Sequence, residues 1–479
     1  MRTQTRVLLA MALVGVLPVP AKARQDVAPQ GVDVLTQGPI HEAFAEPVIY
    51  DPKPGPVVPK EPPPPVNELP PDQKPEGANV QWIPGYWAWD DARKDYIWVS
   101  GLWRAMPPGR QWVPGYWQGV EGGYRWVPGY WAGLDANRVQ YLPEPPASLE
   151  NGPNAPPPSA NATWAPGNWV WQGDGYAWRP GFWVEPQGNW MWTPASFAYT
   201  PNGYLYNAGY WDYPLASRGQ PFAPVAFSQP LYAQPNFLYT PSVGLLTSAL
   251  LSSLFVRPAY GSYYFGNYYA ANNFQNGIYP WYAFHGSRYG YDPIYAYESV
   301  RNLRTNPRWA DELHRTYNER RDNPQLRPAG TFAEMQRRGG AAPVLARPLN
   351  QLTGAQGVAN TGRFEHVEAA QRQELARQAA RTHGFAAERQ RREVAAHRDA
   401  PAAALAAPRH VDAPRSPIAS PHAEASRSAP PAMPQHPQVD RAVRPTAAPS
   451  AVRHEPRVET RPPAPHPAPA PARGGGRRR

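Results

Sequence analysis

Carboxylates are the side chains in this sequence that come closest to a catalytic or metal-binding pattern. Six of them occupy apparent turns between aromatic segments: Asp90, Asp91, Asp95, Glu121, Asp174 and Glu185. Two carboxylates flanking a glycosidic bond can hydrolyse it, and the group of three Asp could bind Ca²⁺. Their Gly, Ala and Arg neighbours are typical of solvated turns, and their spacing matches no calcium loop. We therefore interpret them as turn residues and predict that the chain is not an enzyme.

Histidine and cysteine chemistry is restricted by where these residues occur. The chain has no Cys, and all eleven His lie outside residues 79–212. Nucleophile–His arrangements and Cys/His metal sites are therefore excluded from that region. His285 and His314 could share a metal if the fold brought them together, but the sequence indicates no third ligand. Phosphate-binding and dinucleotide-binding Gly motifs are missing as well. We expect no metal and no cofactor.

Aromatic side chains offer a third kind of chemistry, which is stacking. Of the 19 Trp, 17 fall between Trp82 and Trp211. Indole and phenol rings stack on flat apolar faces such as those of sugars, and their polar tips form hydrogen bonds. Because the chain has few Leu and Ile, we expect most Trp to be core residues. The more variable aromatic positions beside them are the candidate ligand contacts, with greater expected exposure: Tyr86, Tyr116, Tyr130 and Phe182.

The tryptophans belong to a repeated motif, Trp-x-x-Gly-x-Trp. Its copies are WIPGYW (82–87), WVSGLW (98–103), WVPGYW (112–117 and 126–131), WAPGNW (164–169), WRPGFW (178–183), and the degenerate WTPASF (192–197) and YNAGYW (206–211). Within each set of four, the copies start 14 residues apart, except for a first step of 16. Three residues before each leading aromatic stands Gly, Asn or Asp, which tolerate tight turns. Each copy is thus a turn followed by an aromatic strand.

This pattern predicts a mainly β repeat domain: an antiparallel meander of about eight short strands in two sets of four. The central Pro-Gly allows two interpretations. Each copy is either one bent strand with a bulge or a small hairpin around a type II turn. We favour the bent strand, because type II turns splay the strands of a hairpin. A bulge would also place both Trp of a copy on the same side.

The motif resembles the bacterial exported proteins named for their WXXGXW (or YXWGXW) repeats. The resemblance covers about residues 79–212. Ser100, Ala195 and Ala208 depart from the Pro or Gly pattern, and Phe197 replaces a Trp. The resemblance implies a protein associated with the cell envelope. It implies no reaction.

Composition divides the chain into five parts. A basic start, a short apolar run over 7–17 and Ala21-Lys22-Ala23 predict a secretory signal peptide. Stretches rich in Pro or in Pro, Ala and Arg indicate disorder. The parts are 1–23, signal peptide; 24–78, Pro-rich disordered linker; 79–213, repeat domain split by a linker at 138–161; 214–340, Tyr/Phe-rich region ending in short helices; and 341–479, disordered basic tail with a helix over 364–398.

Charge and hydropathy define the expected partners. The net charge is +10, but the repeat region is slightly acidic and the excess lies mainly in the tail. We therefore expect no specific nucleic-acid partner, and an envelope glycan or another anionic envelope polymer as the partner. The longest later apolar run, 244–256, is too short to span a membrane after signal cleavage.

These observations predict an exported protein of the periplasm or cell surface, acting without catalysis as a structural or binding scaffold. The alternative is a carbohydrate-binding module for cell-wall or exopolysaccharide glycans. A glycan-active enzyme is a third and less supported hypothesis.

Overall fold

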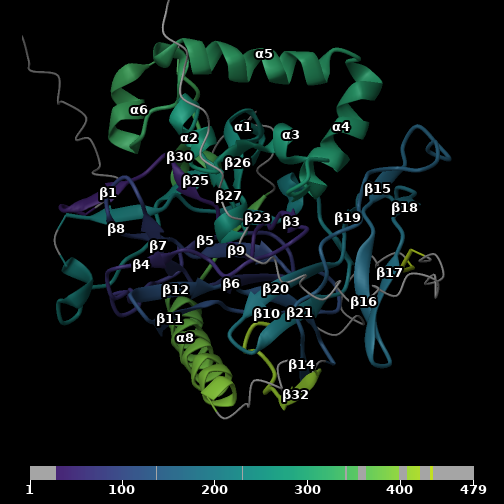
Figure 1. Ribbon diagram of the computed structural model, residues 1–479. Helices are drawn as coiled ribbons and strands as arrows, with labels where there is room; N and C mark the ends of the chain where they lie inside the picture. Colours follow the sequence, from purple (N-terminus) through teal and green to yellow (C-terminus); the bar gives the residue numbers. More distant parts are fainter. Residues whose placement is uncertain are drawn as a thin grey trace, which may run out of the picture.

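Short antiparallel strands dominate the structure, with helices gathered above and below them (Figure 1). The computed structural model describes residues 29–135, 138–228, 230–339, 342–353, 363–398, 407–420 and 432–434. The strands of these residues form twelve small sheets, none with more than four strands. The predicted fold class, mainly β with antiparallel pairing, is confirmed. The predicted signal peptide lies outside the described residues.

Two consecutive copies of the motif form one hairpin, so the eight copies make four hairpins. Hairpin 1 contains β6 (Val80–Ile83), β7 (Tyr86–Asp90), β8 (Asp95–Val99) and β9 (Leu102–Ala105). Hairpin 2 contains β10 (Arg110–Val113), β11 (Tyr116–Val120), β12 (Gly123–Val127) and β13 (Tyr130–Gly133). Hairpin 3 contains β15 (Thr163–Ala165), β16 (Asn168–Gln172), β17 (Gly175–Arg179) and β18 (Phe182–Val184). Hairpin 4 contains β19 (Met191–Thr193), β20 (Ser196–Thr200), β21 (Gly203–Asn207) and β22 (Tyr210–Asp212).

Each predicted strand is divided into two at its central Pro-Gly or equivalent step. In hairpin 1, β6 pairs with β9 and β7 pairs with β8. Residues on both sides of Pro84-Gly85 therefore pair with the other copy and not with each other, which favours the bent strand over the small hairpin. The bend sends the two Trp pairs of this hairpin into different core clusters. The two Trp of one copy, Trp82 and Trp87, therefore do not face the same side, contrary to the expectation from a bulge.

The aromatic residues of the two copies face each other across each hairpin. Trp82 lies opposite Trp103 and Trp87 opposite Trp98, with ring centroids 5.1 and 5.2 Å apart in edge-to-face geometry. The same register recurs in hairpins 2 and 3. In hairpin 4, a Phe–Tyr pair replaces the second Trp pair. Such ring pairs contribute about 0.5–1.5 kcal/mol beyond their burial.

The motif glycine is required because the leading Trp of the partner copy packs directly on it. A Cβ at Gly101 would lie 2.4 Å from Cζ2 of Trp82, and one at Gly85 would lie 2.8 Å from the Trp98 ring. The same approach, at 2.3–2.5 Å, occurs at the remaining motif glycines: Gly115, Gly129, Gly167, Gly181 and Gly209. Any larger residue at these positions overlaps an indole ring, which explains the fixed Trp-x-x-Gly spacing.

The expectation of a disordered linker over residues 24–78 is wrong for its described part. Residues 29–78 contain β1 (Val32–Val34), β2 (Gly38–Pro39), β3 (Val48–Ile49), β4 (Val57–Val58) and β5 (Gln73–Pro75). Apolar residues between the prolines are buried, among them Leu35, Phe44 and Val66. The hairpins provide a surface on which these few apolar residues pack, so the segment does not need a core of its own.

The expectations for the linker 138–161 and for the tail also need correction. β14 (Arg138–Leu142) joins β20, β21 and β32 in one sheet. The tail forms β30 (Ala346–Pro348), α7 (Leu349–Thr353), β31 (Phe364–His366), α8 (Ala369–Arg398) and β32 (Arg409–Asp412). The predicted helix exists as α8, and it buries side chains including Ala379, Arg389 and Glu393 although its apolar stripe is poor. Polar contacts with the hairpins replace apolar packing, as described below. Residues 435–479 lie outside the described residues.

The Tyr/Phe-rich region combines short strands with a helical layer. Its strands are β23 (Gly219–Pro221), β24 (Val225–Phe227), β25 (Val243–Leu245), β26 (Leu254–Arg257), β27 (Ser262–Phe265), β28 (Tyr279–Pro280) and β29 (Gly290–Tyr291). Its α-helices are α1 (Thr247–Leu250), α2 (Ala271–Gln275), α3 (Trp281–Phe284), α4 (Pro293–Thr305), α5 (Trp309–Asp322) and α6 (Phe332–Arg338). Single 3₁₀ turns occupy Leu215–Ser217, Leu231–Ala233, Leu251–Ser253, Pro258–Tyr260 and Pro324–Leu326.

The short helices predicted at the end of this region are α4, α5 and α6. Trp309, Leu313 and Tyr317 of α5 all contact the main core. Thr331 caps α6 by accepting a hydrogen bond from the Glu334 N–H at 3.2 Å.

Substitution of a motif glycine tests the packing of Trp on Gly. We expect Gly85→Ala to lower the free energy of unfolding by about 2–3 kcal/mol, because the new methyl group overlaps the Trp98 ring and the Val99 carbonyl. Gly175→Ala is the matched control, since a Cβ there meets open space. It should change stability by less than about 0.5 kcal/mol. Equal effects of the two substitutions in urea unfolding would contradict the packing described here.

Candidate functional site

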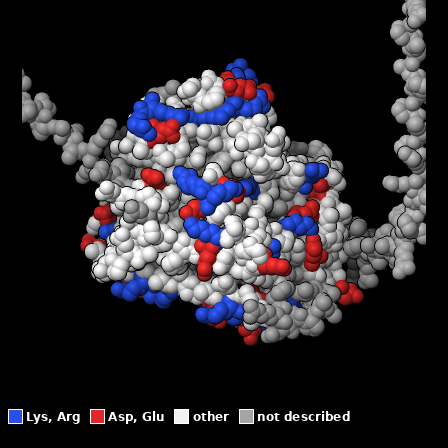
Figure 2. All heavy atoms as spheres, turned by 60° about the vertical axis from the view of Figure 1, so that its left-hand side comes forward, with Lys and Arg blue, Asp and Glu red and all other residues white. Residues whose placement is uncertain are grey.

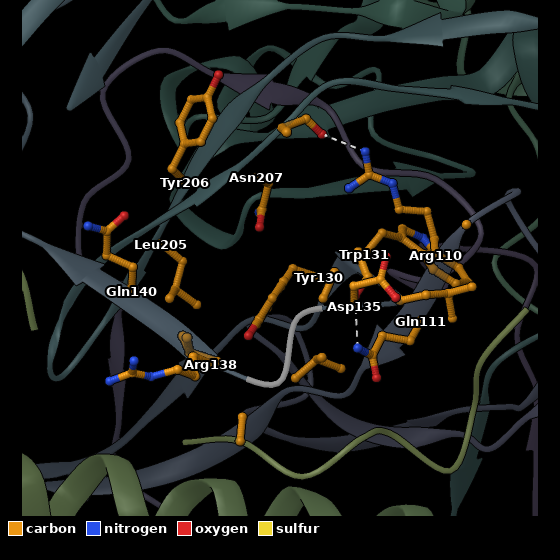
Figure 3. Close-up of a pocket in the computed structure, with 18 of the residues that line it drawn as sticks. Arg110, Gln111, Tyr130, Trp131, Asp135, Arg138, Gln140, Leu205, Tyr206 and Asn207 are labelled. Atoms are coloured by element: carbon orange, nitrogen blue, oxygen red, sulfur yellow. Dashed lines mark hydrogen bonds between the residues drawn. The ribbon is translucent and has the colours of Figure 1, made fainter. Parts of the chain in front are cut away.

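The main candidate site is a cavity of about 630 Å³ bordered by hairpin 2, hairpin 4, β14, β32 and α8 (Figure 3). Much of its wall is aliphatic or aromatic: Val113, Tyr130, Trp131, Tyr141, Leu205, Tyr206, Tyr210, Phe385 and Val411. Polar and charged side chains line the remainder: Arg110, Asp135, Arg138, Gln140, Asn207, Arg392 and Asp412. An apolar wall with a few polar groups is typical of sites for small molecules.

Tyr130 places a polar group inside this cavity. Figure 3 shows its hydroxyl directed into the cavity between Leu205 and Arg138. Burial raises the pKa of Tyr130 to about 12, so the hydroxyl keeps its proton at neutral pH and can donate a hydrogen bond. On the opposite side, the Arg110 guanidinium lies 4.6 Å from the Tyr210 ring and donates to the Gly209 carbonyl at 2.9 Å. Arg110 is thereby held in place.

A buried ionic cluster from α8 supports the floor of the cavity. Nε of Arg389 donates to Oε1 of Glu393 at 2.9 Å. The hydroxyls of Tyr116 and Tyr141 also donate to the Glu393 carboxylate, at 2.6 and 2.8 Å. The Arg389 guanidinium lies 5.2 Å from the Tyr116 ring and 5.1 Å from that of Tyr130. Every charge in the cluster is therefore paired, as buried charges require.

The four predicted ligand contacts do not gather in one site. Tyr130 lines the cavity, whereas Tyr116 is in the ionic cluster beneath it. Tyr86 stacks on Trp126 at 5.0 Å, and Phe182 packs with the core of hairpins 3 and 4. The expectation of greater exposure is wrong for Tyr116 and Tyr130, which are 5 % and 6 % exposed. Their strands lie under α8, which the sequence analysis placed in a disordered tail.

Four of the six acidic turn residues have structural partners. Asp90 accepts hydrogen bonds from the Ala92 and Arg93 N–H groups at 2.8 and 3.1 Å. Asp91 accepts from the Trp89 indole at 3.0 Å and forms an ion pair with Arg257. The other four lie at the far end of this turn or elsewhere. Asp95 pairs with Lys60, Glu185 accepts a hydrogen bond from Ser159, and Glu121 and Asp174 are exposed in other turns.

The two predicted histidines also lie in different places. His285 hydrogen-bonds the Asp292 backbone carbonyl at 3.1 Å, whereas His314 packs on Tyr282. Within the described part of the chain, no three His, Asp or Glu side chains gather as a metal site. The cavity holds Asp135, Glu393 and Asp412, but Glu393 is already bound by Arg389 and two tyrosines.

Buried carboxylates at the hairpin bends are the residues that the sequence analysis missed. Glu68 accepts hydrogen bonds from the N–H groups of Gly85 and Gly101 at 3.1 Å and from the Trp98 indole at 3.2 Å. Glu42 binds Gly129 and the Trp126 indole in the same way, and Glu150 binds Gly167 and the Trp164 indole. Each carboxylate thus satisfies a glycine N–H at the bend and a neighbouring indole. An isolated Glu in a Pro-rich stretch gives no sequence signal for this role.

Carbonyl groups at the bends are bound by cationic or imidazole side chains. Nη1 of Arg389 donates to the Pro114 and Pro128 carbonyls at 2.9 and 3.0 Å. His383 of α8 binds the Gly85 carbonyl at 3.0 Å. His41 binds the Pro84 carbonyl at 3.0 Å. Burial lowers the pKa of His41 to about 4, so it acts as a neutral donor at pH 7. These contacts explain how a helix with few apolar residues stays on the hairpins.

Glu68 should make the stability of the protein depend on pH. Burial raises its pKa from 4.5 to about 7, so the folded state binds this proton more tightly than the unfolded state does. The contribution of Glu68 to the free energy of unfolding therefore falls as pH rises from 4.5 to 7, by about 3 kcal/mol. Glu68→Gln removes this titration. Unfolding measured from pH 5 to 8 should show the parent losing stability relative to the variant; parallel curves would contradict the assignment.

The comparisons with known proteins concern the repeats. The profile of the WXXGXW repeat family, described as two copies of the repeat, matches residues 78–104, 112–132, 163–184 and 189–212. Each matched segment corresponds to one hairpin. Comparisons with curated proteins and with solved structures give no match. No helix in the described residues is both long and apolar enough to cross a membrane. The chain therefore carries several copies of the WXXGXW repeat across residues 78–212, and each pair of copies is one bent hairpin of Trp packed on Gly.

Proposed function

We propose that the chain is an exported, non-catalytic envelope protein that acts as a structural or binding scaffold. The observation that supports this proposal is that the motif tryptophans are buried and paired inside the fold. In hairpin 1, all four are at most 4 % exposed and pair across the strands. The repeats therefore build a rigid frame around which the N-terminal segment and α8 pack, and the exposed parts are available for partners.

An enzymatic role has less support. Asp90 accepts hydrogen bonds from backbone N–H groups, and Asp91 and Asp95 pair with basic side chains. The buried carboxylates Glu42 and Glu68 bind the bends, and Glu393 is paired with Arg389. These carboxylates are engaged in the fold, whereas glycoside hydrolysis requires two carboxylates on either side of the substrate.

Binding of an envelope glycan in the cavity is the second candidate function. The cavity combines aromatic side chains with planar polar groups, and the Tyr130 hydroxyl is directed into it. Sugars offer both apolar ring faces and many hydroxyl groups, so this combination suits them.

Loss of the Tyr130 hydroxyl tests glycan binding in the cavity. We expect Tyr130→Phe to weaken binding of the recognised glycan about fivefold, as for the loss of one hydrogen bond. Tyr199→Phe, in β20 but outside the cavity lining, is the control and should bind like the parent. Tryptophan fluorescence titration against a panel of cell-wall and exopolysaccharide fragments gives the measurement. No response of the parent to any fragment would leave structural scaffolding as the function.

The anionic polymer partner is tested through the charge at the C-terminus. Figure 2 shows basic side chains along the helices at the top of the molecule, interspersed with acidic ones. Residues 435–479 carry nine Arg against three Asp and Glu. A chain ending at Pro434 keeps all described residues and should elute from an anionic polymer column at clearly lower salt than the full chain. Elution at the same salt would contradict a role for the tail.

A further inference from the structure

Hairpin 3 differs from the other hairpins in how far its indoles are exposed. In hairpin 1, all four motif tryptophans are buried, whereas Trp164, Trp178 and Trp183 of hairpin 3 are half-buried. Figure 1 shows this hairpin at the right-hand edge of the molecule, below α4. Large aromatic rings that stay partly exposed in an otherwise buried motif indicate a surface used for binding.

A cleft of about 600 Å³ lies beside these indoles. Trp164 and Trp183 form one wall, with ring centroids 5.3 Å apart at an angle of 71°. The segment from Glu150 to Thr163 and the loop from His285 to Arg288 contribute to the others. The two rings are therefore held at an angle along one side of an open cleft.

Hydrogen bonds fix both indoles in place. The Trp183 indole donates to the Ala155 carbonyl at 2.9 Å. The Trp164 indole donates to Oε1 of Glu150 at 2.9 Å, and the other Glu150 oxygen accepts from the Gly167 N–H. Because the indole N–H groups are occupied, a ligand meets chiefly the apolar parts of these rings. Their pre-organised faces suit the flat apolar face of a sugar ring.

The cleft is lined by one acidic side chain, Glu150, and one basic side chain, Arg288. Both oxygens of Glu150 already accept hydrogen bonds, so this carboxylate has little capacity left for a ligand. His285 is neutral at pH 7, because burial lowers its pKa to about 4. Arg288 lies in the loop opposite; it contacts the neighbouring Tyr289 and forms no ion pair with any described residue. A guanidinium at this position favours a carboxylate on the ligand.

We propose that this cleft binds an acidic oligosaccharide, with Trp183 and Trp164 stacking on a sugar ring and Arg288 binding a carboxylate. The proposal rests on the glycan-binding candidate function and gives it a second site and a sugar class. Ser287 in the facing loop offers a hydroxyl donor to the remainder of the sugar, since its oxygen accepts from the Tyr289 N–H.

The test uses calorimetric titration of the full mature chain with two probes: a uronic-acid tetrasaccharide and the same compound after reduction of its carboxyl groups. Trp183→Ala should weaken the binding of both probes at least about tenfold. Arg288→Gln changes an exposed side chain and should weaken the acidic probe alone, about fivefold, so that it binds like the reduced one. Trp171→Ala, a half-buried Trp of the same hairpin outside the cleft, should leave both affinities unchanged.

Each other outcome overturns the inference. Parent-like binding by both Trp183→Ala and Arg288→Gln, with loss in Tyr130→Phe, would place the glycan in the other cavity and leave the candidate function intact. Equal weakening of both probes by Arg288→Gln would remove the acidic specificity. If the parent binds neither probe, this inference fails, and the fragment panel described above then decides whether glycan binding of any kind remains.

Discussion

The packing of a Trp ring on a backbone glycine of the partner copy is the interaction on which the rest of the structure depends. It is reciprocal in hairpin 1, where Trp98 covers Gly85 and Trp82 covers Gly101. Each ring packs on the glycine of the partner copy and not on that of its own copy, so two copies form one packing unit. The chain has no Cys and few Leu and Ile, and these interlocked pairs provide much of the apolar burial that other folds obtain from aliphatic side chains.

Bending a strand at Pro-Gly interrupts the ladder and leaves backbone N–H and C=O groups without partners in the sheet. In a buried bend, each such group costs free energy unless another part of the chain supplies a partner. Glu42 and Glu68 supply acceptors from the N-terminal segment, and His383 and Arg389 supply donors from α8. The unpaired backbone groups at the bends of the repeats therefore explain why two segments with compositions typical of disorder are part of the fold.

The sequence predicts the periodic and local features well. The eight copies, the turn residues and the strands all follow from spacing, because they depend on neighbouring residues. It does not predict that Leu35 and Phe44 are buried, that Tyr116 lies beneath a helix, or that Glu68 binds a bend more than fifteen residues away. These features depend on contacts between segments that are distant in the sequence. The average composition of a segment does not reveal the few residues that make such contacts. Tyr130 is expected to be exposed, yet its ring is buried and it lines the cavity.

The repeat is chiefly a packing unit of Trp on Gly, and the proposed binding surfaces are secondary to it. A double-mutant cycle in hairpin 4 tests this most directly, because the Trp192 ring is the nearest described group to a Cβ built at Gly209, at 2.5 Å. Gly209→Ala should lower the free energy of unfolding by about 2 kcal/mol in the parent and by much less in a chain that already carries Trp192→Leu. Coupling of this size is the predicted result. Strictly additive effects of the two substitutions would contradict the packing of Trp on Gly and, with it, the explanation of the fold given above.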